Sequence, residues 1–168
     1  LLFRLCLYET NKKPIKCLLT SNDKGEVILT YSDLPVEHEY PIKANNIDKR
    51  GVVTIYELPE ENPKMGTYFG GLDPIEVDIT VSSDSIASLD IVKKRVEVEY
   101  KDEKTGKIEK RIEGGKLVAT YRGRFNTVEE TNEQMWLLIK LYNAFVLVER
   151  NKPNFINYMK RNGRANLH

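Results

Sequence analysis

The sequence predicts an α/β unit built on a mixed β-sheet, in which an antiparallel three-strand meander is followed by a helix and a parallel strand. From about residue 66, strand-length apolar runs alternate with turn sequences, and the apolar period then changes from two residues to the spacing of a helix. A continuous apolar run ending at Glu149 follows, which is typical of a strand buried on both faces of a sheet.

The meander begins with a short apolar strand over residues 67–74, which ends on Asp73 and Pro74. A second strand is expected over residues 85–94. Residues 96–100 then alternate Val and Tyr with Glu, which is the two-residue period of a half-solvated strand. Turn sequences at 102–106 and 114–115 lead to a further strand over 116–121, which completes the antiparallel meander.

An amphipathic helix follows the meander. Thr127 and Glu130 have the spacing of a capping box, in which each side chain accepts a hydrogen bond from the other residue's backbone amide. The apolar residues on one face of this helix are Val128, Met135, Leu138, Ile139 and Tyr142. A buried strand over 144–148 comes next, and a last helix starts near Pro153 and packs Phe155, Ile156 and Met159. Because a helix connects the meander to the buried strand, that strand should run parallel to the first strand and beside it.

Residues 1–65 are expected to form a connecting segment with short β-strands and no core of its own. Apolar runs rich in β-branched residues predict strands at 27–31 and 52–56. Two prolines within residues 58–63 interrupt the pattern and place the boundary there. Residues 66–168 then form the main unit.

Composition excludes several classes of protein. The 26 Lys and Arg residues nearly balance the 25 Asp and Glu residues, so a nucleic-acid partner must be argued from local charge clusters. The sequence has no apolar run of about 18 residues, which predicts a soluble protein without a membrane-spanning helix. Cys6 and Cys17 lack the spacing and the histidines of a zinc site. Two buried thiols in a reducing cytoplasm are the preferred interpretation, and one disulfide is the alternative.

Two carboxylates that end neighbouring strands form the candidate reactive site. Asp73 closes the first strand and Glu149 closes the parallel one, so the predicted topology brings both to one edge of the sheet. Carboxylates suit Mg²⁺ or Mn²⁺, and two such ions about 3.5–4 Å apart can activate water and stabilise the leaving oxygen of a phosphodiester. In the alternative interpretation, the two acids are solvated or paired with a nearby Lys or Arg.

Asp78 and Asp84 follow the first strand and are candidate auxiliary metal ligands from a loop. Their alternative role is to accept hydrogen bonds from nearby backbone amides in a turn or at a strand edge.

Three segments resemble a known family. They are Tyr-Phe-Gly-Gly-Leu-Asp-Pro at 68–74, Leu-Val-Ala-Thr-Tyr-Arg-Gly-Arg at 117–124 and Tyr-Asn-Ala-Phe-Val-Leu-Val-Glu-Arg-Asn at 142–151. In this order and spacing they make residues 66–168 resemble the nuclease domain of the large terminase subunit of tailed bacteriophages, particularly of the crAss-like group.

The resemblance implies a ribonuclease H-like fold that cuts double-stranded DNA during genome packaging, with Mg²⁺ or Mn²⁺. Asp73 matches the family's central metal ligand and Glu149 its second acidic ligand. The third ligand, an Asp, is expected beyond residue 168, so the unit should lack its last elements and this chain alone should have an incomplete site.

The sequence has no phosphate-binding loop of an ATPase, so ATP hydrolysis is not expected. The implied partners are double-stranded DNA, a packaging ATPase domain, the portal and the small terminase subunit. The implied location is the procapsid packaging vertex in the bacterial cytoplasm, with no membrane partner.

A cluster of cations is the candidate DNA-binding surface. Residues 150–168 contain no Asp or Glu, and the candidate phosphate contacts are Arg122, Arg124, Arg150, Lys152, Lys160, Arg161 and Arg164. The alternative is a solvated helix whose basic C-terminal end is favoured by the helix dipole.

Two other functions fit the same fold. The unit can be a non-catalytic docking or DNA-binding module in which the acids have no metal. It can also be a resolvase- or transposase-type nuclease, which uses similar acids on other DNA structures.

Overall fold

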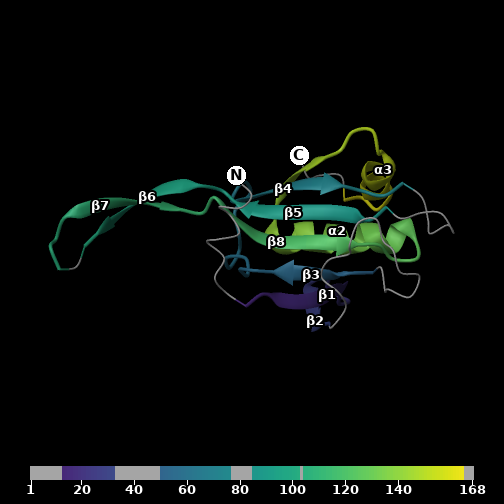
Figure 1. Ribbon diagram of the computed structural model, residues 1–168, viewed down its shortest axis with the longest axis horizontal. Helices are drawn as coiled ribbons and strands as arrows, with labels where there is room; N and C mark the ends of the chain where they lie inside the picture. Colours follow the sequence, from purple (N-terminus) through teal and green to yellow (C-terminus); the bar gives the residue numbers. More distant parts are fainter. Residues whose placement is uncertain (1–12, 33–49, 77–84, 103, 165–168) are drawn as a thin grey trace.

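The computed structural model describes residues 13–32, 50–76, 85–102 and 104–164. Seven strands form one sheet in the order β2-β1-β3-β8-β5-β4-β9, and two more strands form a separate sheet, β6-β7. The elements are β1 (Ile15–Ser21), β2 (Val27–Tyr31), β3 (Val52–Ile55), β4 (Tyr68–Asp73), β5 (Ala87–Lys93), β6 (Val96–Lys101), β7 (Ile108–Glu113), β8 (Lys116–Gly123), α2 (Val128–Tyr142), β9 (Phe145–Val148) and α3 (Asn154–Arg161). The chain therefore has a mixed α/β fold, as the sequence predicts (Figure 1).

The centre of the sheet confirms the predicted connection between the meander and the last strand. β4 pairs antiparallel with β5, and β5 pairs antiparallel with β8. β9 pairs parallel with β4, from Phe69 opposite Phe145 to Leu72 opposite Val148. Helix α2 connects β8 to β9 and lies across one face of the sheet, behind the strands in Figure 1. The opposite face is called the outer face below.

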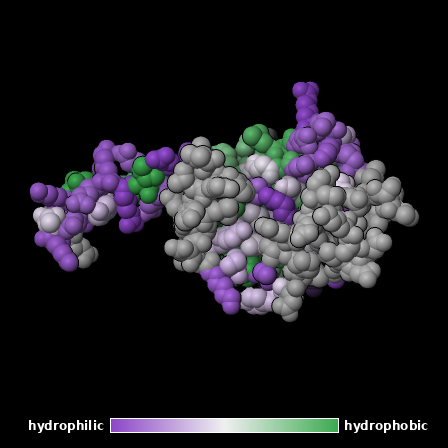
Figure 2. Space-filling model, viewed as in Figure 1, coloured by the Kyte–Doolittle hydropathy of each residue, from purple (hydrophilic) through white to green (hydrophobic). Residues whose placement is uncertain are grey.

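β6 and β7 form a hairpin that projects away from the main sheet (Figure 1). The alternation of residues 96–100 predicts a half-solvated strand of the meander, and that placement is wrong. Most residues of both hairpin strands are exposed, because neither face of the hairpin is covered by a second layer. Figure 2 shows the hairpin as a largely hydrophilic arm with a few apolar residues. The meander consists of β4, β5 and β8.

Glycines allow the hairpin to branch from two paired strands. Lys93 of β5 pairs with Lys116 of β8, and the amide of Gly115 donates a hydrogen bond of 2.9 Å to the carbonyl of Lys93. Gly114 has a φ of +77°, and a Cβ atom there would lie 2.0 Å from the carbonyl oxygen of Lys94. No other residue type fits at position 114, next to the main chain of Lys94, without moving the backbone.

The residues before position 65 contribute three strands to the same sheet. The strands expected at 27–31 and 52–56 are confirmed as β2 and β3. β3 pairs with β8, and β1 pairs with both β3 and β2. All four residues of β3 are buried, and Cys17 and Leu19 of β1 lie in the same hydrophobic core as α2. Cys17 is a free, buried thiol, as predicted, whereas Cys6 lies outside the described residues.

Helix α2 has the predicted cap and the predicted buried face. The Thr127 hydroxyl accepts a hydrogen bond from the amide of Glu130, and the Glu130 carboxylate accepts one from the amide of Thr127, at 3.2 Å each. The helix ends at Asn143, which adopts the left-handed conformation with a φ of 46°. Its buried face includes the predicted residues Val128, Met135, Leu138, Ile139 and Tyr142. This face covers the sheet and closes the core.

Helix α3 is short, and Pro153 lies directly before its first residue, as predicted. Phe155 and Met159 are buried with Tyr158, whereas Ile156 is only partly buried. Within the described ranges, neither helix has the length and apolar character needed to span a membrane.

Candidate functional site

Asp73 and Glu149 meet at one edge of the main sheet. Asp73 is the last residue of β4, and Glu149 directly follows β9. The amide of Glu149 donates a hydrogen bond of 3.0 Å to the carbonyl of Leu72, which extends the parallel β4–β9 ladder by one step. Both carboxylates are partly exposed, with side-chain exposures of 51% for Asp73 and 43% for Glu149. Two acids that are distant in sequence therefore emerge side by side from rigid strand ends.

Lys152 joins the two carboxylates. Its ammonium group donates a hydrogen bond to Oδ1 of Asp73 and lies 3.3 Å from Oε2 of Glu149. The hydrogen bond to Asp73 raises the pKa of Lys152 above its ordinary value, partial burial opposes this, and Glu149 adds to the rise. The lysine is therefore a firmly charged cation at the point where the carboxylates converge.

This pair of acids has the donor chemistry that a divalent cation requires. Carboxylate oxygens are hard ligands, and the position between them already holds a positive charge, the Lys152 ammonium. Among the described residues, no group of three or more His, Cys, Asp or Glu side chains is arranged to hold a metal ion. Asp78 and Asp84 lie outside the described residues. The pair could thus supply two ligands to such a cation.

The segments that follow the two strands are fastened to each other. The amide of Asn154 donates to Oε1 of Glu76 at 3.2 Å, and the Asn154 side chain donates to the carbonyl of Glu76 at 2.9 Å. The amide of Lys152 donates to the carbonyl of Glu149 at 3.3 Å, which closes a tight turn. These bonds fix the loop that carries Lys152 against the end of β4.

A second ion pair lies on the outer face beside Asp73. Ser88 of β5 pairs with Asp73 on one side and with Arg122 of β8 on the other, so these three residues form one row across the sheet. The Arg122 guanidinium contacts both carboxylate oxygens of Asp90, at 2.6 and 2.8 Å. Because strands are about 4.8 Å apart, Arg122 lies roughly 10 Å from Asp73 along this row.

Gly71 leaves the outer face bare between these charged groups. It pairs with Asp90 on one side and with Leu147 on the other. A Cβ atom at Gly71 would meet open space, whereas one at Gly70 would lie 2.9 Å from the carbonyl oxygen of Asp90. Gly70 is therefore needed for packing, and Gly71 keeps open the surface next to the acids.

The other predicted phosphate contacts differ in their exposure to solvent. Arg124 is 1% exposed, and its guanidinium donates to the carbonyl and the hydroxyl of Ser85, at 2.8 and 2.9 Å. It is buried away from any phosphate, so the prediction that it contacts DNA is not retained. Arg150 and Lys160 are exposed, and within the described part of the chain neither forms an ion pair.

Arg161 and Arg164 connect the two helices. Arg161 pairs with Glu129 of α2 at 3.0 Å. Arg164 pairs with Glu133 at 2.5 Å, and its guanidinium stacks over the rings of Trp136 and Tyr158. Arg164 therefore holds α3 against α2, and its cationic group is already engaged. Trp136 is partly buried and packs against the hydrophobic core.

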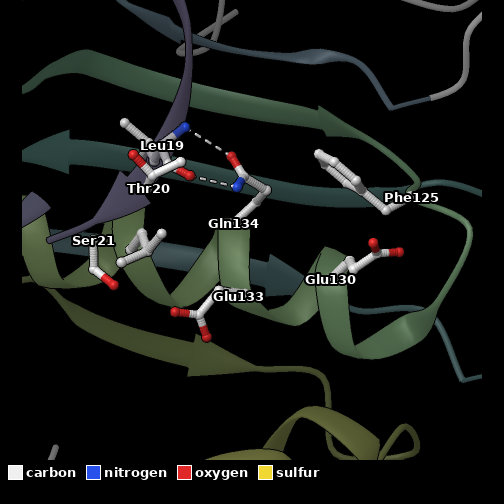
Figure 3. Close-up of a pocket in the computed structure, with 8 residues that line it drawn as sticks. Leu19, Thr20, Ser21, Phe125, Glu130, Glu133 and Gln134 are labelled. Carbon is white, nitrogen blue, oxygen red and sulfur yellow. Dashed lines mark hydrogen bonds between the residues drawn. The ribbon is translucent and has the colours of Figure 1, made fainter. Parts of the chain in front are cut away.

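A pocket lies elsewhere, between β1 and α2. It has a volume of about 280 Å³ and is lined by Leu19, Thr20, Ser21, Phe125, Glu130, Glu133, Gln134 and Leu137. Figure 3 shows that Gln134 reaches from α2 to the main chain of Leu19, where its amide accepts from the Leu19 N–H at 3.0 Å and donates to the Leu19 carbonyl at 2.7 Å. None of the acids or cations discussed at the sheet edge lines this pocket.

The ion pairs of Lys152 agree with the alternative interpretation of the sequence, in which the two acids are paired with a nearby Lys or Arg, and the three-residue spacing between Glu149 and Lys152 is a signal for such a pair. The Asp90–Arg122 pair has no comparable signal, because the two residues are distant in sequence and only the strand register brings them together. Comparisons with protein-family models, with curated proteins and with solved structures gave no significant match to this chain.

Proposed function

We propose that the chain carries the nuclease unit of a viral genome-packaging terminase, a ribonuclease H-like enzyme that cuts double-stranded DNA with Mg²⁺ or Mn²⁺. The observation that carries this proposal is the meeting of Asp73 and Glu149 around one cationic group at the ends of β4 and β9. Strand-end carboxylates of this kind suit metal-assisted phosphodiester hydrolysis.

The sheet topology supports the ribonuclease H-like part of the proposal. Three antiparallel strands, β4, β5 and β8, are followed by a helix and by β9, which returns parallel to β4. The three segments that resemble terminase nucleases overlap β4, β8 and the stretch from the end of α2 through β9 to Asn151. The resemblance therefore falls on the elements that build the candidate site.

The residues of this site would have different roles in metal binding and DNA binding. Asp73 and Glu149 would hold the metal, because both project from strands whose positions are fixed by ladder hydrogen bonds. When bound, Mg²⁺ or Mn²⁺ supplies an activated water and stabilises the leaving oxygen. Arg150, exposed directly after Glu149, would contact a backbone phosphate and orient the duplex without reading its sequence. Gly71 would leave room for the DNA backbone beside the acids.

The test is Mn²⁺ binding by calorimetry together with plasmid nicking on the same samples. Asp73→Asn and Glu149→Gln should each abolish Mn²⁺ binding, because each removes one of two ligands. Glu61→Gln is the matched control, since Glu61 is exposed in the loop between β3 and β4, and it should bind like the unmodified chain. Mn²⁺ binding that survives both acidic substitutions would refute the proposed site.

A non-catalytic docking or DNA-binding module is the second candidate. It is favoured by Lys152, which neutralises much of the charge of the two acids without any metal. In this case the folded chain binds duplex DNA but shows no saturable Mn²⁺ binding, and Asp73→Asn leaves DNA affinity unchanged.

A further inference from the structure

The Lys152 ammonium lies between the two carboxylates that would hold a metal ion. It contacts Asp73 and Glu149 together, and it is the least exposed of the three side chains, at 31% against 51% and 43%. Water can therefore reach both carboxylates, while the lysine covers the space between them. A divalent cation held by both acids cannot share that space with the ammonium, since the two like charges would repel strongly at such a distance.

The backbone holds the lysine in this place. Its loop is short, running from Glu149, whose amide is bonded to Leu72, to Asn154, which is bonded twice to Glu76. Both ends of the loop are therefore attached to the chain around the end of β4. Among the described residues, the ammonium group contacts the carboxylates of Asp73 and Glu149, so displacement of the lysine breaks these two contacts.

We propose that Lys152 is a positioning residue that acts as a resident cation: it holds Asp73 and Glu149 together before metal arrives and is displaced when a divalent cation binds. Two consequences follow from its charge. Before metal binding, the lysine offsets the repulsion between the two acids. During metal binding it competes, so it weakens the affinity for the metal and makes the site selective for divalent over monovalent cations.

Once displaced, the ammonium remains next to the site on a short, fastened loop. A free lysine at this position has an anionic phosphate as its natural partner. Lys152 would therefore exchange its carboxylate partners for DNA only after the metal is in place. Because this role presupposes the metal site proposed above, its test must separate the failure of one from the failure of the other.

The test compares Lys152→Met with Lys64→Met by Mn²⁺ calorimetry and by thermal unfolding with and without Mn²⁺. Lys64 is an exposed lysine of the loop between β3 and β4 and serves as the matched control. Lys152→Met should bind Mn²⁺ about tenfold more tightly than the unmodified chain, because one competing positive charge is gone. It should also unfold at a lower temperature without metal, and Mn²⁺ should raise its unfolding temperature by more than that of the unmodified chain. Lys64→Met should match the unmodified chain in all these measurements.

Lys152→Gln serves if Lys152→Met does not fold, since a neutral amide can still donate to Asp73. If the unmodified chain binds Mn²⁺ through Asp73 and the Lys152 variants bind no more tightly, the role of Lys152 is refuted and the metal site stands. If neither the unmodified chain nor any folded Lys152 variant binds Mn²⁺, the metal site itself is refuted, and the resident-cation role with it.

Discussion

Gln134 provides a sharp test of how the N-terminal strands are attached to the rest of the sheet. Among the described residues, β1 pairs with β3 from Ile15 to Cys17, so within this part of the chain the main-chain groups of Leu19 have no strand partner on that side. Gln134 of α2 fills this gap with two hydrogen bonds, one to the N–H and one to the carbonyl. Leu19 is 1% exposed, so both groups would otherwise be buried without partners.

The expected cost of Gln134→Ala follows from these two bonds. Each buried main-chain group left without a partner costs about 1–3 kcal/mol, and the pocket beside Gln134 lets water satisfy part of this loss. We therefore expect the free energy of unfolding to fall by about 2–4 kcal/mol. For a chain of this size, that loss lowers the midpoint of thermal unfolding by about 5–15 °C.

Urea unfolding of three variants measures this cost. Gln134→Met keeps the side-chain volume but loses both hydrogen bonds, so it should be destabilised nearly as much as Gln134→Ala. Glu129→Ala, which removes an exposed ion pair of the same helix, should cost less than about 1 kcal/mol. If both Gln134 variants stay within about 1 kcal/mol of the unmodified chain, β1 is not held to α2 as described, and residues 1–65 behave as a connecting segment.

Two further substitutions test the outer face and the hairpin. Gly71→Val should raise the free energy of unfolding by about 1 kcal/mol, because valine favours a strand and its Cβ meets open space. The same substitution should reduce DNA cleavage, because the valine side chain fills the surface next to Asp73. Unchanged cleavage in the stabilised variant would show that DNA does not approach this surface. Deletion of residues 96–113 should leave the thermal midpoint and Mn²⁺ binding unchanged, because Lys93 and Lys116 are already paired and the four remaining residues can close the turn. Loss of cooperative unfolding in the deleted chain would contradict this independence of the hairpin.

Much of the central fold could be predicted because local sequence and chain connectivity both constrain it. The change of apolar period locates α2, and the capping box at Thr127 fixes its start. Since a helix lies between β8 and β9, β9 is expected to run parallel to a strand of the meander, and it pairs with β4. The continuous apolar sequence of β9 predicts burial on both faces, and that prediction is wrong, because β9 is the last strand of the described sheet and its Leu147 is 73% exposed. Asp73 and Glu149 then meet as a consequence of register.

The features that could not be predicted from the sequence depend on which surfaces of the folded chain pack against each other. The alternation in β6 describes a strand but does not reveal that no layer covers it. The prolines within residues 58–63 predict a boundary, yet prolines also occur in loops between strands of one sheet, and these residues lie between β3 and β4. Arg124 shows the same limit for side chains, because its charge is visible in the sequence and its burial is not.

The charges of the outer face lead to a last prediction, that metal binding and DNA binding strengthen each other. Asp73, Glu149 and Asp90 are paired with Lys152 and Arg122, so these five residues carry one more negative than positive charge, which weakens the attraction of a phosphate backbone to the adjacent Arg150. A divalent cation at Asp73 and Glu149 would make the net charge of this group positive and displace Lys152 from the two carboxylates.

Fluorescence anisotropy with a phosphorothioate duplex, which resists cleavage, measures the coupling. Mn²⁺ should tighten DNA binding about tenfold, and by linkage the duplex should tighten Mn²⁺ binding by the same factor. The salt dependence of DNA binding should steepen by about one phosphate contact when Lys152 is released. Asp73→Asn removes the proposed metal ligand, so its DNA affinity should show no dependence on Mn²⁺, which separates the site from general effects of Mn²⁺ on DNA. If the unmodified chain binds Mn²⁺ at Asp73 but its DNA affinity does not change, then the acids and the duplex do not share one surface, and the docking function becomes the better explanation of this sheet edge.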